Sequence, residues 1–184
     1  PLANLHVVPE PISDSRAVFT EPVSAAFEPF EQITISGTER CVVLGDGKLG
    51  ILCAWALATT CADVTIVGHH PGKLESAPWR MIRTTNSARS VEPGADIVVD
   101  ATGTAEGLRD AIALCRPRGT VILKSTAAEG APLNLAPVVI NEIKIVGSRC
   151  GLFERGLHAL LTYDFPLERL VKGRYPLDEA EAAF

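Results

Sequence analysis

From residue 40 onward, short runs of β-branched and apolar residues alternate with segments whose apolar residues recur at helical spacing. The apolar runs predict strands at residues 40–45, 63–68, 80–84, 96–101, 119–123 and 143–148. The helical segments fall at residues 48–60, 72–77, 105–115, 135–141 and 153–163. Strands that alternate with helices predict a mostly parallel sheet with helices on both faces. The fold class is therefore α/β, a single domain built on a doubly wound, mostly parallel, six-stranded sheet.

The residues before the first strand follow a different pattern. Residues 1–11 contain three prolines, and we expect an extended linker there. A helix is predicted from about residue 14 to about residue 32. Pro22 and Pro29 must kink or break this helix, because proline lacks the amide N–H of an interior helical residue. Residues 75–93 are polar and only weakly periodic, so the pattern defines the third strand poorly.

The first strand runs directly into a turn whose glycines are spaced G-x-G-x-x-G, and a helix follows at once. Gly45 allows a tight turn, Gly47 leaves no side chain between the backbone and a pyrophosphate, and Gly50 lets the helix lie close to the strand. Backbone N–H groups of Lys48 and Leu49 would bind the pyrophosphate, whereas the Lys48 ammonium is either a further contact or simply solvated. This context predicts a Rossmann dinucleotide site, and a purely structural turn is the alternative.

The end of the second strand bears on which dinucleotide is bound. An NAD-specific site has an acidic residue there that binds the adenosine ribose hydroxyls, and this sequence has Gly68. Without that carboxylate nothing repels a 2′-phosphate, and His69, His70 and Lys73 could bond to it. The sequence thus modestly favours NADP over NAD as the cofactor. A pair of inert, solvent-facing histidines is the alternative, because histidine is mostly neutral at pH 7.

Small and polar residues follow the fourth, fifth and sixth strands, where the ligand crevice of this fold opens. Ala101, Thr102 and Gly103 form a turn that leaves volume for the nicotinamide ribose. Asp100 is predicted to bond to nearby backbone N–H groups rather than to act as an acid or base. Arg149 either binds a phosphate or substrate or forms a surface salt bridge. The candidates for cofactor contact at the last two strand ends are Lys124, Ser125, Ser148 and Arg149.

Composition excludes several other classes of protein. The 184 residues suit one domain with a core and do not accommodate a second full domain. Although 47% of the residues are hydrophobic, no apolar stretch approaches the roughly 20 residues that cross a bilayer. A net charge of −5 without a clustered basic face argues against nucleic acid. The five cysteines lack C-x-x-C spacing, so we expect reduced core thiols in a cytoplasmic protein.

Taken together, these residues resemble the medium-chain dehydrogenase/reductase family, which includes zinc alcohol, polyol and threonine dehydrogenases. Besides the glycine turn, the resemblance is carried by Asn4-Leu5-His6-Val7-Val8-Pro9, Phe19-Thr20-Glu21-Pro22, Val99-Asp100-Ala101-Thr102-Gly103, Lys124-Ser125-Thr126 and Val146-Gly147-Ser148-Arg149-Cys150-Gly151. It implies the cofactor domain of such an oxidoreductase. Residues 1–36 would then be a linker and leading helix packed against a missing catalytic domain. Residues 37–152 would be the Rossmann core, and residues 153–184 a truncated C-terminal helical segment.

The resemblance also implies a zinc enzyme as the longer parent, in which zinc polarises an alcohol or carbonyl oxygen during hydride transfer. Glu21 matches a position that holds, or lies beside, a zinc ligand in polyol-dehydrogenase-like members. The remaining ligands would come from the missing domain, and a catalytic zinc needs about three protein ligands. We therefore expect no bound zinc in this chain alone and no catalysis by it. The resemblance further suggests a homodimer through the edge strand at residues 143–147.

Two other classes of function remain open at this point. The chain could be a stand-alone dinucleotide-binding or redox-sensing module, in which cofactor occupancy changes a partner contact without turnover. A methyltransferase that binds adenosylmethionine is disfavoured, because that ligand lacks the pyrophosphate that the helix start would bind.

Overall fold

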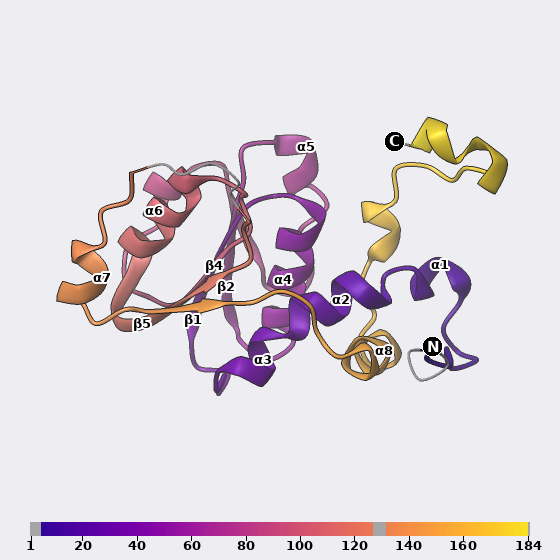
Figure 1. The fold of residues 1–184 in the computed structure, drawn as a ribbon, viewed down its shortest axis with the longest axis horizontal. Coiled ribbons are helices and arrows are strands. Elements are labelled where there is room, and N and C mark those ends of the chain that lie inside the picture. Colours follow the sequence, from indigo (N-terminus) through magenta and orange to yellow (C-terminus); the bar gives the residue numbers. More distant parts are fainter. Residues whose placement is uncertain (1–4, 127–131, 184) are drawn as a thin grey trace.

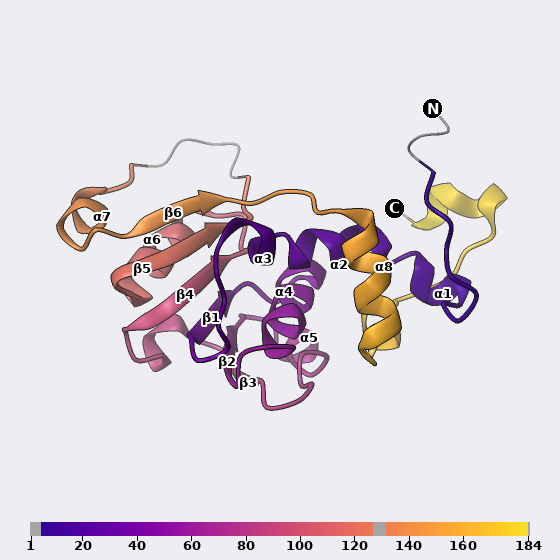
Figure 2. The ribbon, with the colours of Figure 1, turned by 90° about the horizontal axis from the view of Figure 1, so that it is seen from below.

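The structure, a computed structural model, describes residues 5–126 and 132–183, so the first four residues of the predicted linker and Phe184 lie outside it. Its centre is a six-stranded sheet in which all neighbouring strands are parallel (Figure 1), in the order β3-β2-β1-β4-β5-β6 (Figure 2). The strands are β1 (Arg40–Leu44), β2 (Asp63–Val67), β3 (Arg83–Thr85), β4 (Ala95–Asp100), β5 (Cys115–Leu123) and β6 (Lys144–Gly147). This arrangement confirms the predicted doubly wound α/β fold.

Helices cover both faces of the sheet. The longer ones are α2 (Thr20–Phe27), α4 (Lys48–Ala58), α6 (Ala105–Leu114) and α8 (Phe153–Thr162). Shorter turns are α1 (Asp14–Ala17), α3 (Pro29–Gln32), α5 (Pro71–Leu74), α7 (Ala136–Ile140) and the 3-10 segments η2 (Ala88–Ser90), η3 (Leu167–Leu170) and η4 (Leu177–Ala183). None of the helices within the described residues has both the length and the apolar character needed to cross a bilayer.

The alternation of side chains along β1 explains why this strand is apolar throughout. Cys41 and Val43 join the core beneath α4, whereas Val42 and Leu44 join the core beneath α6. All four side chains are nearly inaccessible to solvent. A strand whose two faces are both covered by helices buries every residue, so it lacks the polar alternation of a half-exposed strand.

Helix α4 is also buried around its whole circumference, because it lies between the sheet on one side and α2 and the C-terminal segment on the other. Trp55 of this helix is fully buried, and its indole N–H donates to the carbonyl of Ala77 at 2.8 Å. Phe165 stacks on the Trp55 ring with centroids 6.0 Å apart. Phe165, Leu167 and Leu170, which follow α8, therefore complete this core, whereas residues 171–179 are exposed. Figure 2 shows α8 beside α2, with α1 and η4 on the side of the molecule away from α7.

The leading helix differs in detail from the prediction, since it is divided into α1, α2 and α3. Pro29 begins α3, so a break occurs there as expected. Pro22 lies in the first turn of α2, where a missing N–H removes no interior hydrogen bond. The other break consequently falls before it, at Val18 and Phe19. The five cysteines are free, and four of them are buried; Cys150 is exposed.

The turn that leads into β1 has an acid-sensitive element. The carboxylate of Glu39 accepts hydrogen bonds from the backbone amides of Ser36 at 2.9 Å and Gly37 at 2.8 Å. Burial alone would raise the pKa of Glu39, but the hydrogen bonds outweigh it and lower the pKa from 4.5 to about 2. Because the folded-state pKa is the lower one, the stabilisation is complete above about pH 4.5 and disappears as the pH falls towards 2.

We predict that Glu39→Gln lowers the free energy of unfolding at pH 7 by about 1–2 kcal/mol, because hydrogen bonds to a charged group contribute about 1.5–3 kcal/mol and this carboxylate is only half-buried. The difference between the variant and the wild type should shrink as the pH falls from 4.5 to 2. Urea unfolding at several pH values measures both effects, with the exposed Glu75→Gln as the control. A difference that stays constant with pH would contradict this role of Glu39.

Candidate functional site

The turn between β1 and α4 fits tightly against the neighbouring strand. Gly45 has a φ of +112°, and a Cβ built on it would lie 2.6 Å from the carbonyl oxygen of Ala101. A Cβ on Gly50 would overlap the backbone carbonyl of Gly45. A Cβ on Gly47, in contrast, would have no atom within 4 Å. The first and third glycines are thus required by packing, whereas the second faces open space, the geometry expected if a ligand lies against it.

Helix α4 begins immediately after this turn. Gly47 is its N-cap, and no side chain caps that end of the helix. The first-turn amides of Lys48 and Leu49 are therefore not covered by a capping side chain, and the helix dipole adds a partial positive charge there. The Lys48 side chain is exposed. This end of α4 has the two properties that favour an anionic group, free donors and positive potential.

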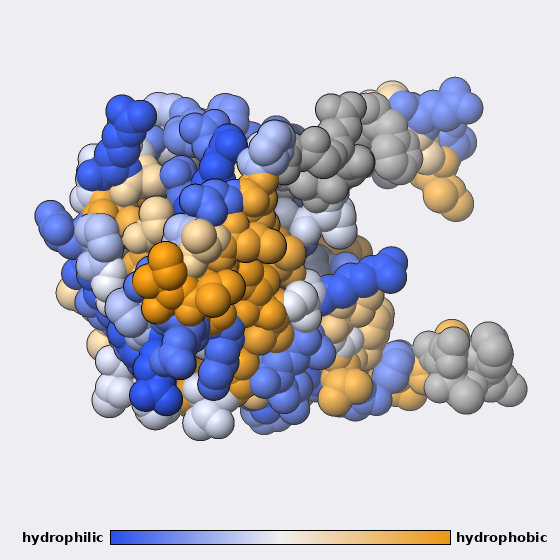
Figure 3. Space-filling model, turned by 60° about the vertical axis from the view of Figure 1, so that its left-hand side comes forward, coloured by the Kyte–Doolittle hydropathy of each residue, from blue (hydrophilic) through white to orange (hydrophobic). Residues whose placement is uncertain are grey.

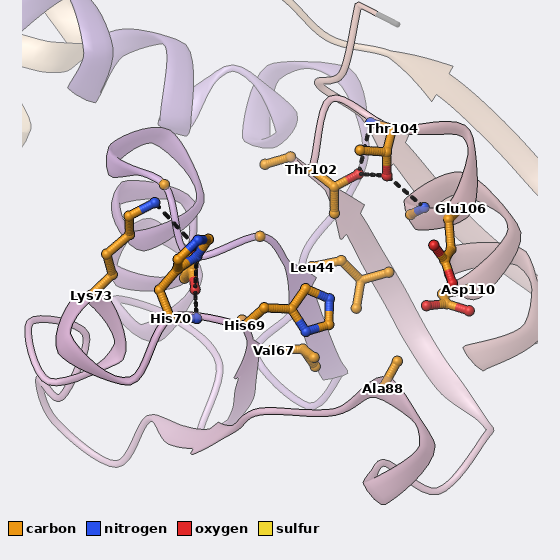
Figure 4. Close-up of a pocket in the computed structure, with 16 residues that line it drawn as sticks. Leu44, Val67, His69, His70, Lys73, Ala88, Thr102, Thr104, Glu106 and Asp110 are labelled. Atoms are coloured by element: carbon orange, nitrogen blue, oxygen red, sulfur yellow. Dashed lines mark hydrogen bonds and ion pairs between the residues drawn. The ribbon is translucent and has the colours of Figure 1, made fainter.

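A cavity of about 390 Å³ opens beside the turn, at the carboxyl ends of β1, β2 and β4 (Figure 4). Eight of its lining residues are predicted site residues, namely Gly45, Gly47, Gly68, His69, His70, Lys73, Ala101 and Thr102. The other lining residues are Leu44, Asp46, Val67, Ala88, Thr104, Glu106, Gly107 and Asp110. The cavity is large enough for a nucleoside and lies at the β1–β4 boundary, where the strand order reverses.

Asp46, in the middle of the glycine turn, was not among the predicted site residues. Its side chain occupies the space next to Gly68, where a Cβ would lie 2.5 Å from Oδ2 of Asp46 and overlap its Cβ. Oδ2 accepts the backbone amide of His70 at 2.6 Å, and Nδ1 of His70 lies 3.1 Å from each carboxylate oxygen. The end of β2 therefore has a carboxylate beside it after all, supplied by the turn. In the sequence, the signal for this contact is an acidic residue in the turn after β1, Asp46, together with a glycine at the end of β2, Gly68.

The Asp46 carboxylate is buried, whereas the basic side chains beside it are partly exposed. The side chain of Asp46 is 8% exposed, compared with 63% for His70 and 44% for Lys73. The ammonium of Lys73 lies 4.0 Å from Oδ1. Burial alone would raise the pKa of Asp46, but the amide and ring of His70 outweigh it, with a smaller contribution from Lys73, so the pKa is lowered. Asp46 is therefore ionised at neutral pH.

The opposite wall of the cavity comes from the β4–α6 connection and from α6 itself. Figure 4 shows Glu106 and Asp110 across the cavity from His70 and Lys73. Burial, and then the nearby Glu106, raise the pKa of Asp110. The carboxylate of Asp100 accepts hydrogen bonds from the backbone amide of Thr102 at 3.0 Å and from its hydroxyl at 2.8 Å. The structural role expected for Asp100 thus has direct support.

Four further predicted site residues follow β5 and β6 and lie outside this cavity, namely Lys124, Ser125, Ser148 and Arg149. Lys124 is buried, and its ammonium donates to Ser148 Oγ at 3.0 Å, to the carbonyl of Arg149 at 3.1 Å and to that of Ala25. The Ala25 carbonyl would bond to the amide of residue 29 in a continuous helix, but that residue is Pro29. Lys124 therefore satisfies an acceptor that proline leaves without a partner.

Hydrogen bonds of Ser125 and Lys124 connect the ends of β4, β5 and β6. Ser125 Oγ accepts the backbone amide of Gly103 at 2.8 Å and donates to the carbonyl of Asp100 at 3.3 Å. Burial lowers the pKa of Lys124, partly offset by Cys53 and Glu28. Lys124 and Ser148 thus have protein partners, whereas Arg149 has an exposed side chain.

Glu21, which occupies the predicted zinc-ligand position, is exposed in the first turn of α2. Within residues 5–126 and 132–183, no three His, Cys, Asp or Glu side chains come together as a metal site would require. A catalytic zinc takes about three protein ligands. The described residues therefore do not fit a zinc ion by themselves.

The chain matches a known protein family over most of its length. Residues 50–162 match the family model described as zinc-binding dehydrogenase. The D-xylulose reductase A of Aspergillus oryzae is 26% identical over 196 residues, which cover 96% of this chain and 55% of that protein. The chain thus spans about half the length of the curated relatives that it matches.

Solved structures show the same fold. A putative zinc-binding dehydrogenase from Sinorhizobium meliloti, bound to NADP, superposes with a TM-score of 0.84 at 18% identity, covering 96% of this chain and 57% of that one. A short chain alcohol dehydrogenase from Escherichia coli, complexed with NADH, superposes with a TM-score of 0.86 at 18% identity, covering 100% and 58%.

We predict that Gly68→Ala lowers the free energy of unfolding by about 1–3 kcal/mol, because the added methyl group overlaps Asp46 in a packed site. Combining it with Asp46→Gly should recover part of the loss, since the overlapping atoms are then removed. Chemical denaturation of the two single variants and the double variant measures the coupling. Additive effects would contradict the contact between these positions.

Proposed function

This chain belongs to the zinc-binding dehydrogenase family, and we propose that it binds a nicotinamide dinucleotide and presents it for hydride transfer in a longer alcohol or polyol dehydrogenase. The proposal rests above all on the open space at Gly47, between two glycines that packing requires. A Cβ there would contact no other atom of the protein, yet it would occupy the path of a pyrophosphate along the start of α4. The two structural neighbours that carry NADP and NADH support the class of cofactor.

The binding residues fall into two groups, one for each half of the dinucleotide. The amides of Gly47, Lys48 and Leu49 would hold the pyrophosphate, and the cavity beside Gly68 would hold the adenosine. The nicotinamide half would extend along the ends of β4, β5 and β6, past Thr102, Ser125 and Arg149. When bound, the nicotinamide accepts or donates a hydride. The chain itself orients the dinucleotide and shields its adenosine half from water.

The choice between NAD and NADP depends on the end of β2. We propose a modest preference for NADP, because His69, His70 and Lys73 line the cavity where a 2′-phosphate would lie. Asp46 acts against this preference, since its carboxylate lies next to Gly68 and pairs with two of these residues.

The whole protein would contain a catalytic domain that packs against residues 1–36, with residues 37–152 as the Rossmann core and residues 153–184 as a helical segment. Glu21 would face that domain, which would supply the other zinc ligands. The cytoplasm remains the predicted location.

We also propose a homodimer through β6, because this strand lies at the edge of the sheet. Figure 3, in which the α7 side is brought forward, shows an apolar area on that face. Val139 and Ile140 of α7 are 76% and 77% exposed, and Ile145 of β6 is 37% exposed.

We predict that NADP and NAD each raise the melting temperature of this chain. A ligand at about 100 times its dissociation constant adds about 2.7 kcal/mol to the free energy of unfolding. Gly47→Val should lose this response and, because valine is a poorer N-cap than glycine, should melt only a few degrees below the wild type without ligand. Gly72→Val is the matched control, because Gly72 also has no atom within 4 Å of a built Cβ but does not line the cavity.

Differential scanning fluorimetry measures these shifts. If neither dinucleotide raises the melting temperature of the wild type, the proposed function is wrong. If Gly47→Val responds as the wild type does, the pyrophosphate does not bind along the start of α4.

A further inference from the structure

The carboxylate of Asp46 lies where the fold normally has an acidic residue from the end of β2. Gly68 holds that position in this chain, and the Asp46 side chain fills the space that a side chain of residue 68 would take. The two residues are 22 positions apart and belong to different strand ends, so the carboxylate reaches the same place from another direction. Asp46 lines the cavity proposed for the adenosine.

Hydrogen bonds hold this carboxylate in one position. Oδ2 accepts the His70 amide at 2.6 Å, and the His70 ring nitrogen lies 3.1 Å from both oxygens. A carboxylate can accept about four hydrogen bonds in all, so these contacts leave acceptor capacity, above all on Oδ1. The ammonium of Lys73 lies 4.0 Å from Oδ1.

NAD and NADP would interact differently with the Asp46 carboxylate. In NAD the adenosine ribose carries hydroxyls, which can donate a hydrogen bond to Oδ1. In NADP the 2′-phosphate brings close to two negative charges, which a fixed carboxylate repels. The same phosphate is attracted by Lys73 and by the histidines. Lys73 is 44% exposed and His70 is 63% exposed, so both can turn towards the phosphate, whereas the buried Asp46 cannot turn away.

We propose that Asp46 is a specificity-determining residue, whose carboxylate accepts the ribose hydroxyl of NAD and opposes the 2′-phosphate of NADP. This inference rests on the proposed dinucleotide function. Asp46 thereby limits the preference for NADP that Lys73, His69 and His70 provide, and the chain accepts both dinucleotides. The determinant of cofactor choice lies in the glycine turn, and not only at the end of β2.

The test measures dissociation constants of NAD and NADP by isothermal titration calorimetry for the whole chain and its variants. Asp46→Asn removes the charge and keeps an oxygen that can accept the His70 amide. We expect the ratio of the NAD to the NADP dissociation constant to rise at least about tenfold, because a like-charge contact to the phosphate is removed. Asp46→Ser, whose hydroxyl can also accept that amide, is the second variant and carries the same expectation.

Asp110→Asn is the matched control, because it removes one negative charge from the opposite wall of the same cavity. Its ratio should stay within about twofold of the wild type if the position of the charge matters rather than the total charge of the cavity.

An unchanged ratio in Asp46→Asn, or an equal change in Asp110→Asn, would overturn the role of Asp46 while leaving dinucleotide binding intact. Failure of both Asp46 variants to fold would also overturn it, since Asp46 would then serve the fold. Absence of binding to the wild type would instead reject the proposed function.

Discussion

The close approach of two backbone segments at Gly45 is the constraint on which the rest of the site depends. Because Gly45 and Gly50 carry no side chains, the turn after β1 can lie against Ala101 at the end of β4, and α4 can begin directly above it. A methyl group at either glycine would push the helix away from the sheet. The position of this turn also fixes where the open space at Gly47 lies and where the Asp46 side chain points. One packing requirement therefore sets both the uncapped start of α4 and the charge next to Gly68.

Most of the fold could be predicted because its signals are local. The apolar runs of β1, β2 and β4 are buried on both faces of the sheet. A continuous apolar run predicts such burial even when the helices that pack on it are not known. The glycine turn can also be identified locally, since its three glycines lie close together in the sequence, although the residue against which Gly45 packs, Ala101, is distant. The break before α2 was harder to predict. Whether a proline ends a helix or lies in its first turn depends on where the preceding chain packs, as Pro22 shows.

The site was only partly predictable, because its polar groups find partners from distant segments. Position 68 taken alone indicates a strand end without an acid, and the Asp46 carboxylate that fills the gap is visible only once β1 and β2 are paired. Lys124 illustrates the same difficulty at the other end of the sheet. Its place after β5 suggested a cofactor contact, whereas three protein acceptors surround its ammonium in the structure.

Along the edge of the sheet where the strands have their carboxyl ends, the surroundings of the charged groups at β2 consequently differ from those at β5. At the β2 end the charges are partly exposed around a cavity, so a ligand can take the place of one ion-pair partner. At the β5 end the cation is buried, and its hydrogen bonds join α2 to the strands that would hold the nicotinamide. Leaving those acceptors unpaired would cost more than the bonds contribute, because buried polar groups without partners are strongly unfavourable. Helix α2 is therefore fixed to the sheet, and Glu21 in its first turn keeps a defined position relative to the ends of β5 and β6. If the proposed function holds, the Glu21 carboxylate and the strand ends proposed for the nicotinamide would thus be held relative to one another as one unit.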